Sequence, residues 1–146
     1  MDWKIDFEGN SWHEHRVRVQ YADTDRMDMV YHGTYARFFE AARVEMLRDL
    51  GVVYAKMEQE GVLLPVVQLN MTYRKPARYD DLLSVLTNVA VAPTSKMVLN
   101  GRIVHQGQVL VEAEVTLVFV DAQSGKPCRA PEAVVTALDE AGLIVG

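Results

Sequence analysis

A change of hydrophobic period near residue 33 constrains the fold of this chain more than any other feature. From Gly33 to Leu50, apolar side chains recur every three or four residues, and charged side chains lie largely on the opposite face. The apolar positions are Tyr35, Phe38, Phe39, Ala42, Met46, Leu47 and Leu50. This spacing predicts an amphipathic helix of about five turns. Gly51 supplies the left-handed residue that commonly ends a helix.

Segments rich in valine and leucine dominate the second half of the chain. Strand character begins after Gly61, and the clearest strands are predicted at residues 82–92, 96–105 and 108–121. Pro93-Thr94 and Gln106-Gly107 separate these three segments. Because links this short join antiparallel neighbours, we expect an antiparallel sheet.

Three weaker segments complete the predicted order of elements. Residues 16–22 alternate polar and apolar side chains, which predicts a first strand ahead of the long helix. A short helical turn is predicted at residues 53–60, and a C-terminal helix between Pro131 and Gly142. One long helix with a sheet of this kind predicts a single α+β domain over residues 1–146, in which the sheet curls around the helix.

The last predicted strand is apolar on both of its faces. One face carries Val111, Ala113, Val115, Leu117 and Phe119, and the other carries Leu110, Val118 and Val120. A single helix covers only one face of a sheet. We therefore expect sheets from separate subunits to pack together or to pair edge to edge.

Composition and charge exclude several classes of protein. The formal net charge of −5 argues against a nucleic-acid surface, which needs a basic face. The first residues hold acids where a secretory signal would be apolar, and no run reaches the length of a membrane span. The single cysteine, Cys128, cannot form an internal disulfide, which agrees with a reducing compartment. We expect a cytoplasmic protein.

Known catalytic and metal-binding motifs fail at specific positions. The segment DTDRMD starts like a calcium-binding loop, but Asp28 stands where that loop needs glycine and Thr34 where it needs glutamate. The segment GNSWH ends in His13 instead of the glycine of a serine-hydrolase elbow. We therefore expect no metal site. The strongest chemical grouping is Asp23, Asp25, Tyr31 and His32, where the first strand leads into the long helix.

The segment YADTDRMDMVYHGTYARFFEAAR resembles the signature of the 4-hydroxybenzoyl-CoA thioesterase family, especially its short-chain acyl-CoA thioesterase branch. The resemblance continues through TYRKPARYDD and covers about residues 16–121. It implies a hotdog fold, in which a five-stranded antiparallel sheet wraps a long helix. It also implies homodimers with one continuous sheet, which often pair into homotetramers.

The resemblance assigns roles to several residues. Asp25 matches the catalytic carboxylate, and Tyr31 and His32 match positions that face the thioester. The sequence departs from the family at Asp28, where glycine is usual. A side chain there could narrow the pocket, repel an anionic acyl group or add a hydrogen bond.

A hydrolytic mechanism follows from these assignments. Unpaired N–H groups around Tyr31, His32 and Gly33 can hold the developing oxyanion at the helix N-terminus. Asp25 can act as general base or as nucleophile, and the sequence does not choose between these routes. Asp23 is expected to make a turn-type hydrogen bond that holds Asp25 in place.

Acyl-CoA is the expected substrate, with no separate cofactor, since coenzyme A is part of the substrate. Its phosphates need cations, and the expected contacts are Arg74, Lys75, Arg78, Thr94, Ser95, Lys96 and Arg129. Two rivals share the fold: a 3-hydroxyacyl thioester dehydratase and a noncatalytic acyl-CoA-binding module. The acyl group, and the choice between coenzyme A and an acyl carrier protein, stay open.

Overall fold

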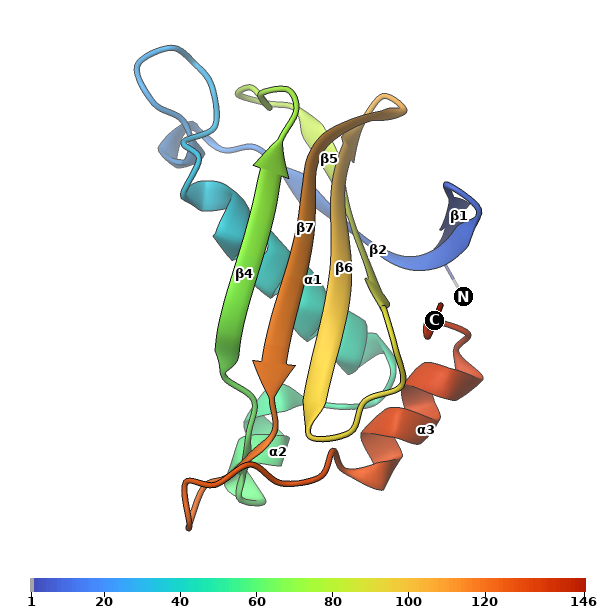
Figure 1. Ribbon diagram of the computed structural model, residues 1–146. Helices are drawn as coiled ribbons and strands as arrows, with labels where there is room; N and C mark the ends of the chain where they lie inside the picture. Colours follow the sequence, from blue (N-terminus) through green and yellow to red (C-terminus); the bar gives the residue numbers. More distant parts are fainter. Residues whose placement is uncertain (1) are drawn as a thin grey trace.

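Helix α1 (Thr34–Asp49) lies across the concave face of a curved antiparallel sheet (Figure 1). The computed structural model describes residues 2–146. The sheet has the order β1-β2-β5-β6-β7-β4, and a two-stranded ribbon joins β3 to β8. The strands are β1 (Lys4–Phe7), β2 (Asn10–Arg18), β3 (Val62–Leu63), β4 (Val66–Tyr73), β5 (Leu82–Val89), β6 (Lys96–His105), β7 (Gln108–Val118) and β8 (Val120–Asp121). The α+β hotdog architecture predicted from the sequence is the one observed.

Close packing of α1 on the sheet depends on a glycine in β6. A methyl group built on Gly101 would lie 2.6 Å from the ring of Phe39, which is buried between the helix and the sheet. Glycine therefore lets the helix approach the strand at this point. Phe38, Ala42 and Met46 continue the buried face of α1, as the predicted periodicity requires.

Two short helices close the end of the core away from the N-terminus of α1. Helices α2 (Tyr54–Gln59) and α3 (Glu132–Glu140) add their apolar faces to the cluster that contains Phe119. Both helices were predicted, and Pro131 and Gly142 flank α3 as expected. None of the helices within residues 2–146 is long and apolar enough to cross a membrane.

The N-terminal strands differ from the prediction. The strand expected at residues 16–22 instead spans Asn10–Arg18, and a 3₁₀ turn, η1 (Tyr21–Asp23), follows it. Strand β1 adds a sixth strand where five were expected, and it shelters Trp12 on the convex face of the sheet. The alternation in β2 was hidden because its buried side chains include a histidine, His13.

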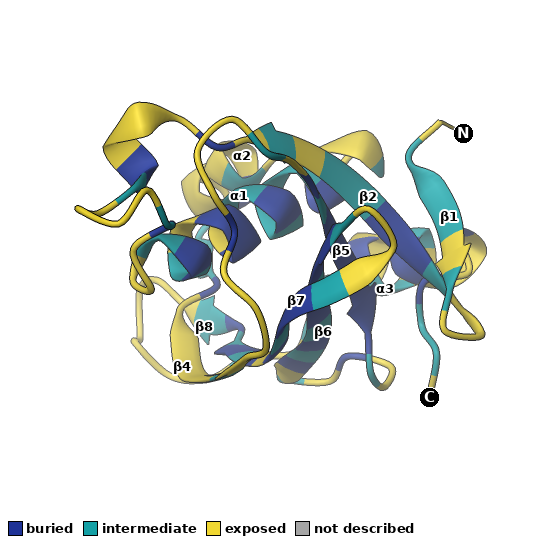
Figure 2. Ribbon diagram, turned by 90° about the horizontal axis from the view of Figure 1, so that it is seen from above, coloured by how far each residue is buried: buried dark blue, intermediate teal, exposed yellow. Residues whose placement is uncertain are grey.

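Strand β4 leaves one edge of the sheet unpaired, and the view from above shows it as largely exposed (Figure 2). Its exposed side chains include Val66, Val67, Leu69 and Tyr73. A row of unpaired backbone groups with apolar side chains is a surface that favours pairing with another strand. The edge is therefore a surface on which the expected contact between subunits can be tested.

His13 is a buried titratable group that joins the sheet to the end of α1. Its side chain is 1% exposed, and Nε2 lies 2.7 Å from Oδ2 of Asp49. Its Nδ1 atom has no hydrogen-bond partner within residues 2–146. Burial lowers the pKa of His13, although the hydrogen bond to Asp49 opposes this effect. A second proton would have to occupy the buried Nδ1 position, which offers no acceptor.

We predict that acid destabilises the protein through His13. Because the pKa of His13 is lowered on folding, stability is fully present above the ordinary value of 6.5 and falls as the pH drops below it. The loss for one proton is at most about 1.4 kcal/mol per pH unit. Urea unfolding at several pH values measures the slope, which His13→Gln should reduce. A slope equal to that of the parent protein would contradict the assignment.

Candidate active site

A short hairpin links η1 to α1 and carries the aspartates of the sequence motif. Thr24 pairs with Val30, the Asp25 N–H donates to the Met29 carbonyl at 2.8 Å, and the Tyr31 N–H donates to the Asp23 carbonyl at 2.9 Å. These contacts define the 23–31 hairpin. Its second arm leads directly into the first turn of α1.

Asp28 occupies the position of this hairpin that favours glycine. Its φ angle is +63°, in the left-handed region, and its N–H donates to the Asp25 carbonyl at 3.3 Å. A left-handed residue at the end of a tight turn is usually glycine, and aspartate is among the few tolerated replacements. The side chain is exposed and does not line the pocket described below. Its effect is therefore on the backbone of the turn.

Asp23 anchors the hairpin to α1. Its side chain is 5% exposed, its Oδ2 accepts the N–H of Gln20 at 2.8 Å, and its Oδ1 pairs with the guanidinium of Arg37 on α1. The first contact is the local backbone hydrogen bond that was predicted for Asp23. The ion pair with Arg37 was not predicted, because it joins residues from different elements.

Asp25 lies at the rim of the site rather than inside it. Its side chain is exposed, and Oδ1 accepts the N–H of Met27 at 2.9 Å. Asp25 lies two residues farther along the hairpin than the pair of Asp23 and Tyr31, or roughly 7 Å of extended chain. Met29, which faces Asp25 across the hairpin, lines the pocket.

The N-terminus of α1 presents free amide groups beside this hairpin. Within residues 2–146, the N–H groups of His32 and Gly33 donate to no other protein group. The ring of Tyr31 lies on Gly33, where a methyl group would come within 2.6 Å of it, and the His32 ring lies 4.5 Å from that of Tyr31. Gly33 is therefore needed for the position of the Tyr31 ring.

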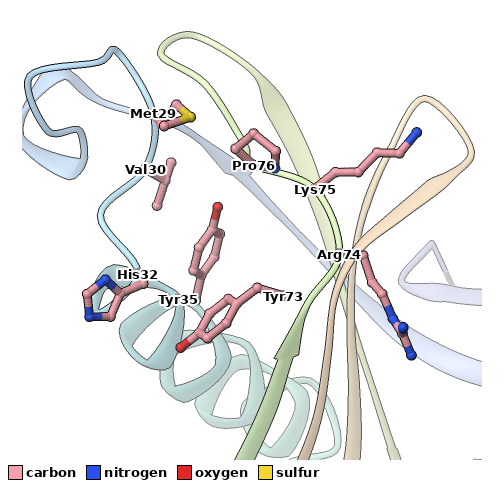
Figure 3. A pocket seen from close by; sticks show the side chains of 8 residues that line it. All are labelled: Met29, Val30, His32, Tyr35, Tyr73, Arg74, Lys75 and Pro76. Carbon is pink, nitrogen blue, oxygen red and sulfur yellow. The ribbon is translucent and has the colours of Figure 1, made fainter.

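A pocket of ≈ 350 Å³ opens between the N-terminus of α1 and the end of β4 (Figure 3). It is lined by Met29, Val30, His32, Tyr35, Tyr73, Arg74, Lys75 and Pro76. Of these, His32, Arg74 and Lys75 were predicted site residues. Tyr35 was predicted as part of the helix face and of the family signature, and Tyr73 lies in the TYRKPARYDD segment, but neither was predicted as a site residue.

The predicted coenzyme A contacts divide into two groups. Arg74 and Lys75 line the pocket, and Arg78 pairs with Met29 in an isolated bridge. Arg74 bonds Glu112 at 2.7 Å, and this contact lowers the pKa of Glu112. Lys75 and Arg78 form no ion pair within residues 2–146, and the ammonium group of Lys75 donates only to the neutral side chain of Gln108, at 3.2 Å, so no carboxylate neutralises either charge.

The second group lies elsewhere in the chain. Thr94, Ser95 and Lys96 lie at the start of β6, and Arg129 is next to Ala130, whose N–H donates to the Thr94 carbonyl. This turn is at the opposite end of the sheet from the pocket, because β5 runs away from Arg78 (Figure 1). A single chain does not bring these four residues to the site.

Comparison with known proteins gives consistent matches. Residues 19–138 match the thioesterase-like superfamily. YneP of Bacillus subtilis, a putative acyl-CoA thioesterase, is 36% identical over 77% of this chain and 83% of its own. The acyl-CoA thioester hydrolase YbgC of Escherichia coli is 38% identical over 82% of this chain and 90% of its own. The crystal structure of a probable thioesterase from Bartonella henselae has a TM-score of 0.77 at 32% identity, over 82% of this chain and 99% of that one.

We predict that Asp28→Gly stabilises the protein. Glycine relieves the left-handed strain at this φ of +63°, at the cost of a more flexible unfolded chain. The net gain should be about 0.5–1 kcal/mol, read from the urea midpoint. Asp139→Gly in helix α3 is the control and should destabilise, since glycine is unfavourable inside a helix. Destabilisation by both substitutions would contradict the role of Asp28 in the turn.

Proposed function

Because this chain belongs to the thioesterase-like superfamily, we propose that it hydrolyses an acyl-CoA thioester at the N-terminus of α1, with Asp25 as the carboxylate that activates the attack. The observation that carries the proposal is the pair of free amides at His32 and Gly33, next to a pocket. Thioester hydrolysis builds negative charge on the carbonyl oxygen. Amides fixed at a helix N-terminus stabilise that charge, and one such donor contributes about 10²- to 10³-fold in rate.

Asp25 supplies the second chemical requirement. It lies across the hairpin from Met29, two residues or roughly 7 Å of extended chain beyond the pair of Asp23 and Tyr31, and we place the substrate carbonyl between its carboxylate and the amides of His32 and Gly33. From there it can take a proton from water or attack the carbonyl carbon itself. In either route, the thiolate of coenzyme A leaves without a strong general acid, because it is a good leaving group.

The neighbouring residues position this chemistry. Asp23 holds the hairpin on α1, Gly33 makes room for the ring of Tyr31, and His32 orients the thioester or the water from the pocket wall. Lys75 and Arg78 meet the phosphates of coenzyme A, with Arg74 shared between the substrate and Glu112. We restrict the coenzyme A contacts within one chain to these three cations.

The finer assignments follow the sequence motif. Within the superfamily, the aspartate pair and the VYH segment favour the 4-hydroxybenzoyl-CoA thioesterase family. A cytoplasmic location agrees with the single cysteine, Cys128. Coenzyme A enters as part of the substrate and leaves as the free thiol after water has cleaved the thioester, so the reaction needs no further cofactor.

A second copy of the chain is the proposed partner, and β4 is the proposed contact. The exposed edge of β4 borders a groove of ≈ 340 Å³ against α1, which is lined partly by Phe39, Leu69 and Arg43. Nε of Arg43 is buried without a hydrogen-bond partner within residues 2–146. Antiparallel pairing of two β4 strands would satisfy the open edge and cover this groove. Pairing of such dimers gives the proposed homotetramer.

We predict that Asp25→Asn lowers kcat for release of free coenzyme A by about 10²- to 10⁴-fold, because the amide cannot act as base or nucleophile. Asp28→Asn is the matched control, since it removes the same charge from the same hairpin but from the turn residue, to which no chemical role is assigned, and asparagine also tolerates its φ of +63°. A panel of acyl-CoA thioesters with a thiol reagent measures both variants. Equal turnover by Asp25→Asn and the parent would refute the catalytic role. A rise in enoyl absorbance without thiol release would instead favour a dehydratase.

We predict that Val67→Asp separates the subunits. Val67 is 58% exposed on the open edge, and a charge there opposes burial at an interface. Val91→Asp is the control, because Val91 is 54% exposed in the loop between β5 and β6. In sedimentation experiments the parent protein should be a dimer or tetramer. The Val67→Asp variant should be a smaller species, and the Val91→Asp variant should have the same size as the parent. A monomeric parent protein would exclude the proposed partner.

A further inference from the structure

Tyr35 places a buried hydroxyl group in the wall of the pocket. The residue is in the first turn of α1, its side chain is 3% exposed, and it lines the pocket. Its ring packs against those of Phe38 and Tyr73, with centroids 6.3 and 5.7 Å away. Figure 3 shows the ring rising from the helix, with its oxygen directed toward the space between Met29 and Pro76.

The hydrogen bonds of this hydroxyl are only half satisfied. Its oxygen accepts the N–H of Ala77 at 3.0 Å, in a buried contact that joins α1 to the segment after β4. Its own hydrogen has no acceptor within residues 2–146, whereas the comparable hydroxyl of Tyr54 donates to the Leu64 carbonyl at 2.7 Å. A buried donor without an acceptor is costly, so a partner is expected to come from the pocket.

The hydroxyl also keeps its proton over the working pH range. Burial raises the pKa of Tyr35 above its usual 10.0, although the bond from Ala77 opposes this. Tyr35 is therefore a fixed donor at neutral pH. The adjacent wall is apolar on the side of Met29, Val30 and Pro76, so the hydroxyl is the polar feature of that part of the pocket.

We propose that Tyr35 is a specificity-determining residue whose hydroxyl donates a hydrogen bond to an oxygen on the acyl group of the substrate. The inference rests on the proposed function, because it places the thioester carbonyl at the amides of His32 and Gly33. Tyr35 lines the same pocket as His32, so its hydroxyl is available to the acyl group that extends from that carbonyl. The favoured acyl groups carry an oxygen a few bonds from the carbonyl, as hydroxyacyl and hydroxyaryl groups do.

The pocket would discriminate between acyl groups because a plain hydrocarbon leaves the hydroxyl of Tyr35 without an acceptor. A hydrocarbon acyl group excludes water from the pocket and offers no acceptor to Tyr35. An acyl group with an oxygen at the right position restores the bond. Sites built to hydrogen-bond a substrate oxygen reject analogues that lack it for this reason. One neutral hydrogen bond corresponds to a preference of about 3- to 10-fold.

Binding of unreactive substrate analogues tests the inference independently of catalysis. The ligands are CoA ketones in which a methylene group separates sulfur from the carbonyl, so that hydrolysis is impossible. Two matched pairs are used: hydroxybenzoyl against benzoyl, and hydroxybutanoyl against butanoyl. Calorimetry gives the ratio of Kd values within each pair. We expect a ratio of about 3- to 10-fold in favour of the hydroxylated member of at least one pair. The pair that shows it identifies the acyl group as aryl or aliphatic.

Two variants decide whether Tyr35 causes the preference. Tyr35→Phe should bring the ratio close to one. Tyr54→Phe removes another hydrogen-bonded hydroxyl, half-buried and away from the pocket, and should leave the ratio as in the parent. A ratio near one in the parent, a ratio kept by Tyr35→Phe, or no binding of any ligand would overturn the inference. If the preference holds but no acyl-CoA is hydrolysed, the proposed function alone fails.

Discussion

The ion pair between Asp23 and Arg37 is the interaction on which the rest of the site depends. Asp23 bonds the chain on both sides of itself: its carboxylate accepts the N–H of Gln20, and its carbonyl accepts the N–H of Tyr31. The partner of its carboxylate is on α1, so the hairpin is fixed to the same helix whose N-terminus supplies the free amides. A buried carboxylate without Arg37 would be costly, and the hairpin would keep only the longer hydrogen bond from the Thr34 hydroxyl to the Asp23 carbonyl, at 3.4 Å, as a side-chain contact with α1.

Curvature of the sheet creates the space that this hairpin borders. Gly101 lets α1 approach β6, and Phe39 fills the gap between them. Helix α1 contacts β2 and β5 extensively, while a groove separates it from β4. Helix α1 therefore packs against the part of the concave face formed by β2 and β5. This placement leaves a pocket on the same face, between the helix N-terminus and the end of β4. The packing of α1 near β2 and β5 therefore determines both the shape of the core and the position of the candidate site.

Regular periodicity explains which parts were predictable from the sequence. The segments 34–49 and 96–105 were predicted within a residue, because each has one buried face and a clear boundary. Strand β2 was misplaced because buried His13 breaks the apolar pattern. The local motif identified Asp23 and His32, but the contact of Tyr35 with Ala77 joins distant segments and has no local signal. The antiparallel order of the strands would have placed the turn at residues 94–96 away from the site, since it follows β5 at the end opposite Arg78.

The exposure of Asp25 connects the proposed catalysis to the proposed assembly. In one chain the carboxylate is open to water, and solvent weakens any electrostatic effect that it exerts on a carbonyl. Thioester hydrolysis by this residue therefore requires that other groups exclude water around it. The substrate can cover the side of Met29, and a second copy paired along β4 can cover the separate groove between β4 and α1. In the proposed dimer, substrate and partner together would shield the carboxylate of Asp25 from bulk water.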